Sequence, residues 1–445
     1  MAIDSEVQVV ESSIVTPSQA TPRHQLWLSA LDLLLVNRGH TPTVYFYRRA
    51  AAAAGDNFFD AARLKESLAR ALVAFYPLAG RLAVDDDADG RFVIDCNGEG
   101  ALLVVARSDL TIGDLGDLTP SPELRKLFVP RVEPSSILLA VQVTFLKCGA
   151  VAFGTALHHA AADAISAFHF FHAWSSLCRR GLAGDDTDTV VELPCHDRSL
   201  LRARSPPMVI PDAFAVFCPK LTLTQKISGP VASKVFTVSD GHVAALKRAC
   251  GGGGGVRVST FAALSAHVWR CVCAARGLPA NATTRLTLPA SVRRRMRPPV
   301  PGGYFGNAVI WVGTSGAVGD VTSEGLGDTA GRIRSAVRRM DDEVVQSAID
   351  YFELAAAEVK KEDAGRPIPG DLPETELRII SWLGMPVYDA DYGWGRPELM
   401  VRAESERSGF VYLMNDGGGG AGGVQVVVCV EAAILEQFEK LLYAK

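Results

Sequence analysis

The apolar and polar positions in the first half of the chain predict a mixture of strands and helices. Two largely apolar runs, residues 138–146 and 150–157, predict a hairpin. From residue 164 to 177 the apolar positions fall close to one face of a helix. The same reading predicts further strands at 42–47, 91–95 and 101–106, and a helix at 59–75 that stops before Pro77.

In residues 185–219 the periodic pattern weakens and prolines accumulate. Such a segment is typical of a connection between domains. Beyond it, residues 240–250 predict a helix capped by Asp240. The pattern also predicts strands at 236–238, 411–414 and 424–430, helices at 259–273 and 432–443, and glycine-rich loops at 251–255 and 417–423.

The length of 445 residues and the 48% share of apolar residues indicate two domains with large buried cores. We place these domains at residues 1–190 and 221–445, with a crossover linker at 191–220. The formal net charge of −4 provides no electrostatic footprint for nucleic acid or an anionic membrane. We therefore expect neither of them as a partner.

Cysteine usage and the first residues bear on the cellular compartment. The nine cysteines are scattered, and the pair Cys271 and Cys273 lacks the second pair that a zinc site needs. Residues 1–22 are polar, and no stretch is long enough to span a bilayer. We expect reduced cysteines, no metal site, a cytoplasmic location and a monomer.

The strongest candidate for chemistry is the run HHAAAD at residues 158–163. It sets an imidazole and a carboxylate four residues apart within the apolar segment 151–174. Burying either group is costly unless it is paired or hydrogen-bonded. An imidazole also titrates near neutral pH, which suits proton transfer. A hydrogen-bonded core histidine is the alternative, and residue types alone leave both interpretations open.

Four short blocks stand in order along the chain. Residues His159–Asp163 fit the motif H-x-x-x-D, and Asp391–Gly395 fit D-F-G-W-G with Tyr in place of Phe. The first motif alone also occurs in other acyltransferases and in peptide-synthetase condensation domains. Together with the blocks Tyr76–Arg81 and Tyr304–Asn307, the chain resembles the plant BAHD acyltransferases, CoA-dependent enzymes of specialised metabolism, over essentially its whole length.

This resemblance implies an α/β fold of two chloramphenicol-acetyltransferase-like domains with an active-site channel between them. CoA would enter from one face and the acceptor from the other, with His159 midway. Acyl-CoA would be the co-substrate, and we expect no further cofactor. One departure is Ala164, where many members have glycine; ordinary backbone angles there suit alanine.

The resemblance also implies roles for the motif residues. His159 would be the general base that takes the acceptor's proton as the acceptor attacks the thioester. Asp163 would be structural and paired with a cation, outside any catalytic triad. Asp391 would also be structural, salt-bridged to an arginine in the Arg293 region. The chain lacks a Gly-x-Ser-x-Gly elbow, which favours direct attack over an acyl-enzyme.

The resemblance also implies an oxyanion donor and residues that contact CoA. Trp382 is the candidate donor to the oxyanion, because the tryptophan of the related Ser-Trp block lines the reaction centre in hydroxycinnamoyltransferases; plain core packing is its alternative. Around CoA we expect Ser259, Thr260 and Arg293. A solvated surface is the alternative for Arg294 and its neighbours.

Residues 40–47 and 297–307 look most like the hydroxycinnamoyl-CoA shikimate and quinate hydroxycinnamoyltransferases. By that likeness Thr43 and Tyr45 would face an aromatic acyl chain, and Phe305 would belong to the acyl and acceptor pocket. We therefore expect p-coumaroyl-, caffeoyl- or feruloyl-CoA as donor.

The acceptor side departs from that group. Where its members carry a Thr-Ser-Trp-x-Arg-like block, this chain has Ile380 for the threonine and Gly384 for the arginine. The upstream arginine loop is rewritten at 358–366, with Arg366 as a candidate replacement. A site without its cation loses affinity for a carboxylate. We expect an amine acceptor such as putrescine or agmatine, with its ammonium neutralised by Glu404, Glu406, Glu362 or Asp363.

Two alternatives stay open. One is O-transfer to shikimate, quinate or another alcohol. The other is a non-catalytic relative that binds acyl-CoA, and the intact His159 and Asp163 argue against it.

Overall fold

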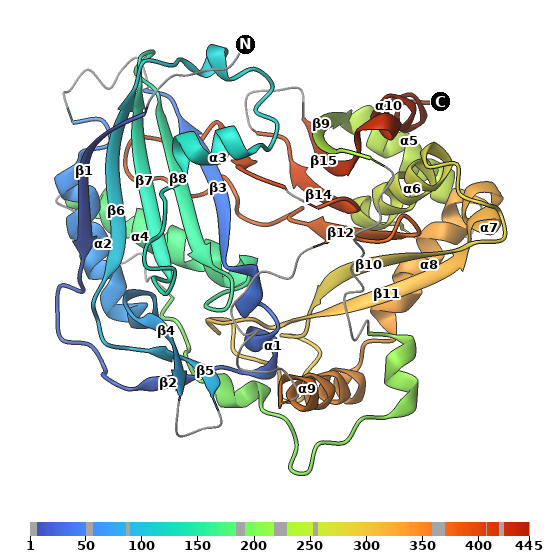
Figure 1. The fold of residues 1–445 in the computed structure, drawn as a ribbon, viewed down its shortest axis with the longest axis horizontal. Helices are drawn as coiled ribbons and strands as arrows, with labels where there is room; N and C mark the ends of the chain where they lie inside the picture. Colours follow the sequence, from blue (N-terminus) through green and yellow to red (C-terminus); the bar gives the residue numbers. More distant parts are fainter. Residues whose placement is uncertain are drawn as a thin grey trace.

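Two mixed β-sheets form the frame of the protein (Figure 1). The computed structural model describes residues 7–49, 57–85, 90–183, 192–217, 229–251, 257–357, 370–405, 407–417 and 422–444. Within these residues, each of the two large sheets has six strands and a smaller third sheet has three. The α/β fold class predicted from the sequence is confirmed.

The first large sheet stands on the left in Figure 1. Its strands lie in the order β1 (Gln8–Val15), β6 (Ala101–Ser108), β7 (Leu139–Leu146), β8 (Val151–His158), β3 (His40–Tyr47) and β13 (Leu399–Arg402). Strands β7 and β8 form the predicted hairpin. Strand β13 comes from the predicted second domain, yet it pairs with β3. The two halves of the chain are therefore joined through this sheet.

The second large sheet contains the later strands. They lie in the order β11 (Val309–Ala317), β10 (Thr283–Ser291), β12 (Glu376–Ser381), β14 (Phe410–Asn415), β15 (Gly423–Glu431) and β9 (Val231–Ser239). The small third sheet has the order β2 (Gln25–Trp27), β5 (Arg91–Asp95) and β4 (Arg81–Asp85).

Alternating side chains of the first sheet bury both of its faces. Tyr45 and Phe153 pack in the core with α2 (Ala61–Ala74) and α4 (Ala164–Ala183), while Val44 and Ala152 pack in the core with α3 (Pro122–Phe128). This alternation follows from the two-residue repeat of a strand. Because both faces are buried, residues 44–47 of β3 and most of β8 are apolar in the sequence without a clear alternation.

The second sheet shares its core with α5 (Asp240–Cys250), α6 (Thr260–Ala275), α8 (Leu326–Arg338) and α10 (Leu435–Leu442). The other α-helices are α1 (Ala30–Leu33), α7 (Val318–Ser323) and α9 (Asp342–Ala357). Short 3₁₀ helices occur at Val36–Arg38, Tyr76–Ala79, Ile112–Leu115, Arg198–Leu201, Pro211–Ala215 and Ala432–Ile434. None of the helices in the described ranges is long and apolar enough to cross a membrane.

The strands and helices predicted from the pattern are present, with ends shifted by a few residues. One cap prediction was wrong: the side chain of Ser239, not Asp240, accepts the N–H of His242 and begins α5. The two glycine-rich loops lie largely outside the described residues. The pattern did not predict the strands and helices between residues 283 and 402.

Candidate active site

A cavity of about 870 Å³ lies between the two large sheets and reaches His159. Strands β3, β8 and β13 of the first sheet and helix α4 contribute lining residues, and so do β14 and the end of β12 in the second sheet. Much of its wall is apolar and aromatic. The side chains that form this part include Tyr45, Phe168, Phe171, Trp382, Met400, Phe410 and Tyr412.

His159 directly follows β8, and its backbone is held from two directions. Its N–H donates to the carbonyl of Gly39 over 2.8 Å, and its carbonyl accepts from Nδ2 of Asn307 over 2.9 Å. The adjacent His158 is buried, with its ring edge-on to that of His40 at 5.0 Å between centroids. Of the two adjacent histidines, His159 is therefore the one that lines the cavity.

Burial lowers the pKa of His159 to about 4, and the charge of Arg38 acts in the same direction. The imidazole is therefore neutral at neutral pH. Its Nδ1 is buried without a hydrogen bond to another described residue. Nε2 is thus the nitrogen left to meet an incoming group. The arrangement suits a group that accepts a proton.

Asp163 makes a two-point ion pair with Arg293. The guanidinium Nη1 lies 2.7 Å from Oδ2, and Nη2 lies 3.0 Å from Oδ1. Asp163 also accepts the N–H groups of Ser166 and Ala308, each over 3.0 Å. Burial alone would raise the pKa of Asp163, but Arg293 and these N–H groups outweigh it and hold the pKa below its ordinary value. The prediction that Asp163 pairs with a cation is confirmed.

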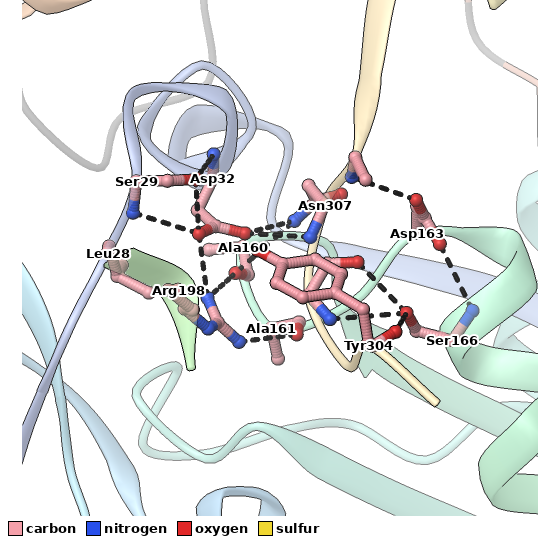
Figure 2. A network of polar contacts seen from close by, with 12 residues as sticks. Leu28, Ser29, Asp32, Ala160, Ala161, Asp163, Ser166, Arg198, Tyr304 and Asn307 are labelled. Carbon is pink, nitrogen blue, oxygen red and sulfur yellow. Dashed lines mark hydrogen bonds and ion pairs between the residues drawn. The ribbon is translucent and has the colours of Figure 1, made fainter. Parts of the chain in front are cut away.

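A second buried network holds the turn after His159, and Figure 2 shows it. Nη1 of Arg198 lies 2.9 Å from Oδ2 of Asp32, and Nη2 of Arg198 donates to the carbonyl of Ala161 over 2.8 Å. Asn307 donates to Asp32 and to the carbonyl of His159, over 2.9 Å in each case. The sequence analysis missed Asp32 and Arg198, because nothing in their local sequence marks them.

The predicted partner of Asp391 was wrong. Its Oδ1 accepts the N–H groups of Gly393 (2.8 Å) and Gly395 (3.0 Å), and a nitrogen of Arg179 lies 3.8 Å from Oδ2. Both glycines have positive φ, at 100° and 101°, so the carboxylate stabilises a tight turn that favours glycine. Arg293 is not available to it, because that guanidinium is paired with Asp163.

Two predicted pocket residues lie elsewhere. Phe305 is fully buried against the rings of Phe75 and His196, with centroids 5.1 and 5.7 Å away, and does not line the cavity. Its backbone belongs to the block Tyr304–Asn307, which holds the turn after His159, and its ring lies in the core. Gly384 also lies outside the cavity lining.

The residues predicted around CoA lie in different settings. Ser259 is exposed and caps α6 by accepting the N–H of Ala262 over 3.1 Å. Thr260 begins that helix. Arg293 is buried and ion-paired, so its prediction as a CoA ligand does not fit. Of the three residues predicted around CoA, Ser259 and Thr260 therefore stay candidates and Arg293 does not.

Three predicted pocket residues, Thr43, Tyr45 and Ile380, do line the cavity, and so does Trp382, the predicted donor to the oxyanion. Thr43 and Thr155 share a hydrogen bond of 2.6 Å between their hydroxyls. Burial raises the pKa of Tyr45, so its hydroxyl stays protonated. Within the described residues, no cluster of three or more His, Cys, Asp or Glu side chains could hold a metal ion.

Charged side chains also line the cavity. Arg38 and Arg402 lie over the rings of Phe410 and Tyr412, at 5.6 and 4.3 Å from the ring centroids. Burial lowers the pKa of Arg38, and the charges of Arg402 and Arg407 lower it further. The buried Glu404, one of the four predicted ammonium partners, is ion-paired with Arg125; the other three lie outside the described residues.

Comparison with known proteins defines the class. A model of the Transferase family matches residues 5–444, and the chain belongs to this family, as the resemblance to BAHD acyltransferases predicted. The protein is a CoA-dependent acyltransferase.

Among its relatives, putrescine hydroxycinnamoyltransferase 1 of Oryza sativa subsp. japonica is 46% identical over 98% of both chains. Shikimate O-hydroxycinnamoyltransferase of Nicotiana tabacum is 37% identical over 98% of this chain and 99% of its own. The crystal structure of vinorine synthase is 23% identical and matches with a TM-score of 0.74 over 97% of this chain and 96% of that one. This last likeness shows the shared fold.

Proposed function

We propose that the protein transfers a hydroxycinnamoyl group from CoA to an amine, with His159 as general base. The observation that carries the proposal is a neutral imidazole in an aromatic-walled cavity between the two sheets. The flat side chains of Phe168, Trp382 and Phe410 suit a planar aromatic acyl group. The similarity to a putrescine hydroxycinnamoyltransferase supports both the donor and the amine.

The chemistry follows from the position of His159. A neutral amine attacks the thioester carbonyl, and a C–N bond forms as the carbonyl becomes an oxyanion. Nε2 of His159 then takes a proton from the attacking nitrogen. The oxyanion collapses, the C–S bond breaks, and the departing CoA sulfur takes that proton to give the thiol. We assign the indole N–H of Trp382 to the oxyanion.

An imidazole with so low a pKa is a weak base for an alcohol or an ammonium ion. Nitrogen in a tetrahedral adduct is far more acidic than in the free amine, so His159 is adequate for proton removal after a neutral amine has attacked. We propose acyl-CoA as the only co-substrate beside the acceptor, with Ser259 and Thr260 near the CoA path.

A second acceptor class is favoured by arginines that line the cavity. A carboxylate such as that of shikimate or quinate would be attracted to Arg38, Arg402 and Arg407, which replace the cation missing at Gly384. The similarity to a shikimate O-hydroxycinnamoyltransferase supports this alternative. The amine remains our primary proposal because the putrescine enzyme is the more similar of the two relatives, at 46% against 37% identity.

The test is thiol release from p-coumaroyl-CoA across putrescine, agmatine, tyramine, shikimate and quinate, with EDTA present throughout. We expect release with at least one aliphatic amine at the highest kcat/KM of the panel. Faster release with shikimate or quinate than with every amine would contradict the amine proposal and show that the acceptor is an alcohol that carries a carboxylate. No release with any acceptor would contradict the hydroxycinnamoyl proposal.

A further inference from the structure

The turn after His159 depends on side chains from other parts of the chain. Its alanines offer no polar side chain, so the turn's carbonyls need partners from elsewhere. Nδ2 of Asn307 lies 2.9 Å from the carbonyl oxygen of His159 and 3.4 Å from that of Ala160. Arg198 donates to the carbonyls of Ala160 and Ala161 over 3.3 and 2.8 Å. Three consecutive carbonyls are thus held by two side chains.

Asp32 ties these two donors together (Figure 2). Its Oδ2 lies 2.9 Å from Nη1 of Arg198, and its Oδ1 accepts from both the backbone N–H and Nδ2 of Asn307 over 2.9 Å. Ser29 donates to Oδ2 from its N–H and its hydroxyl, over 2.9 and 2.7 Å. Asp32, Arg198 and Asn307 are each at most 2% exposed. The arrangement supplies the extra hydrogen bonds that a buried ion pair requires.

We propose that Asp32, Arg198 and Asn307 form a clamp that positions His159 for proton transfer. The three residues come from α1, from the predicted linker and from the loop before β11. None of them lines the cavity, so they act through the backbone of the turn and are positioning residues. The inference rests on the proposed role of His159. Lysine cannot replace Arg198. The guanidinium nitrogens of Arg198 contact the Asp32 carboxylate and two backbone carbonyls at once, and the single ammonium nitrogen of lysine cannot reach all of these acceptors.

The test compares Arg198→Lys with Arg204→Lys. Arg204 lies in the same linker and pairs with the buried Asp350, with Nε 2.6 Å from Oδ2, away from the turn. Thiol release from p-coumaroyl-CoA gives kcat and KM for each variant with the best acceptor. Thermal unfolding gives stability, and NMR titration of the His159 ring signals in the enzyme without acceptor gives the pKa of His159.

Arg198→Lys is expected to lower kcat at least 30-fold while KM for p-coumaroyl-CoA stays within twofold. The pKa of His159 should rise from about 4 towards the ordinary value of a histidine, because a loosened turn admits water to His159. Arg204→Lys should leave kcat and the pKa of His159 unchanged even where it lowers the melting temperature. If Arg198→Lys does not fold, Asn307→Ala decides, since it leaves the ion pair of Asp32 in place.

Wild-type kcat in Arg198→Lys or Asn307→Ala overturns the clamp. An equal loss of kcat in Arg204→Lys also overturns it, because the effect would then be one of general stability. His159→Ala in the same series keeps the two claims apart. If that variant retains activity, the proposed base fails whatever the clamp variants do.

Discussion

Asp163 and Arg293 join the turn that follows β8 in the first sheet to the segment just after β10 in the second, through two hydrogen bonds of 2.7 and 3.0 Å. Both side chains are almost completely buried. The turn at residues 159–163 is therefore fixed to the second sheet by a buried ion pair, whose Asp163 is among the residues that line the cavity. This ion pair explains why the H-x-x-x-D motif ends in an aspartate, whose carboxylate is negatively charged.

Asp163→Asn is expected to destabilise the protein by about 3–5 kcal/mol, because it leaves Arg293 buried without a counter-charge. Urea unfolding measures the loss. Glu436→Gln is the matched control, because Glu436 pairs with Lys440 on the open surface and its change should leave the urea midpoint almost unmoved. Equal effects of the two variants would contradict the structural role of the pair.

The Asp163 pair also has a defined pH dependence. Its folded pKa is held below the ordinary value, so its contribution is complete above about pH 4. The contribution is lost as the pH falls below that value and the carboxylate becomes protonated. Asp163→Asn should therefore differ from the wild type in urea midpoint at pH 7 and converge with it in strong acid. A constant difference at all pH values would oppose this account.

Buried neutral histidines should make the fold sensitive to mild acid. Burial lowers the pKa of His158 to about 3 and of His159 and His196 to about 4. In the unfolded chain a histidine titrates near pH 6.5, so the unfolded state binds more protons between pH 6.5 and 4. Each group then removes up to about 1.4 kcal/mol of stability per pH unit. The urea midpoint should fall over this range, and less steeply in His196→Gln.

Arg402→Gln should separate the two acceptor classes by the sign of its effect. With putrescine, kcat/KM is expected to rise severalfold, because a like charge beside the cavity is removed. With shikimate, kcat/KM should fall about 10-fold or more, because a carboxylate loses a charged donor. Arg48→Gln, at an exposed pair with Glu398, is the control. A change in the same direction with both acceptors would remove Arg402 from acceptor recognition.

Two glycines provide a test of the packing. A Cβ at Gly154 would overlap the backbone carbonyl of Phe128, which lies against β8, so Gly154→Ala should cost more than about 3 kcal/mol. Gly331 lies in α8 with open space around it, so Gly331→Ala should stabilise the protein by about 0.5–1 kcal/mol. Melting temperatures of the two variants measure both effects.

The sequence was informative where a local signal marked a residue. Apolar periodicity located most strands and helices, and motif order located His159 and Asp163 at the cavity. The motif could not reveal which arginine would lie beside Asp391, because that depends on how separate turns meet. The pairing of β13 with β3 is likewise a long-range event without a local pattern.

The clamp and the charged lining were beyond sequence reasoning for a related reason. Asp32 and Arg198 are 166 positions apart, and each looks like a surface charge by its type. Their burial comes from the meeting of α1 with the linker. Arg38 and Arg402 were not predicted either, because they are far apart in the sequence and come together only where the folded chain forms the cavity.

The most direct test of the central claim is the turnover of His159→Ala with p-coumaroyl-CoA and the best acceptor, measured by thiol release on protein whose melting temperature matches the wild type. We expect kcat to fall by about two to four orders of magnitude, with KM for the thioester little changed. A kcat within a few-fold of the wild type would contradict the assignment of His159 as the base.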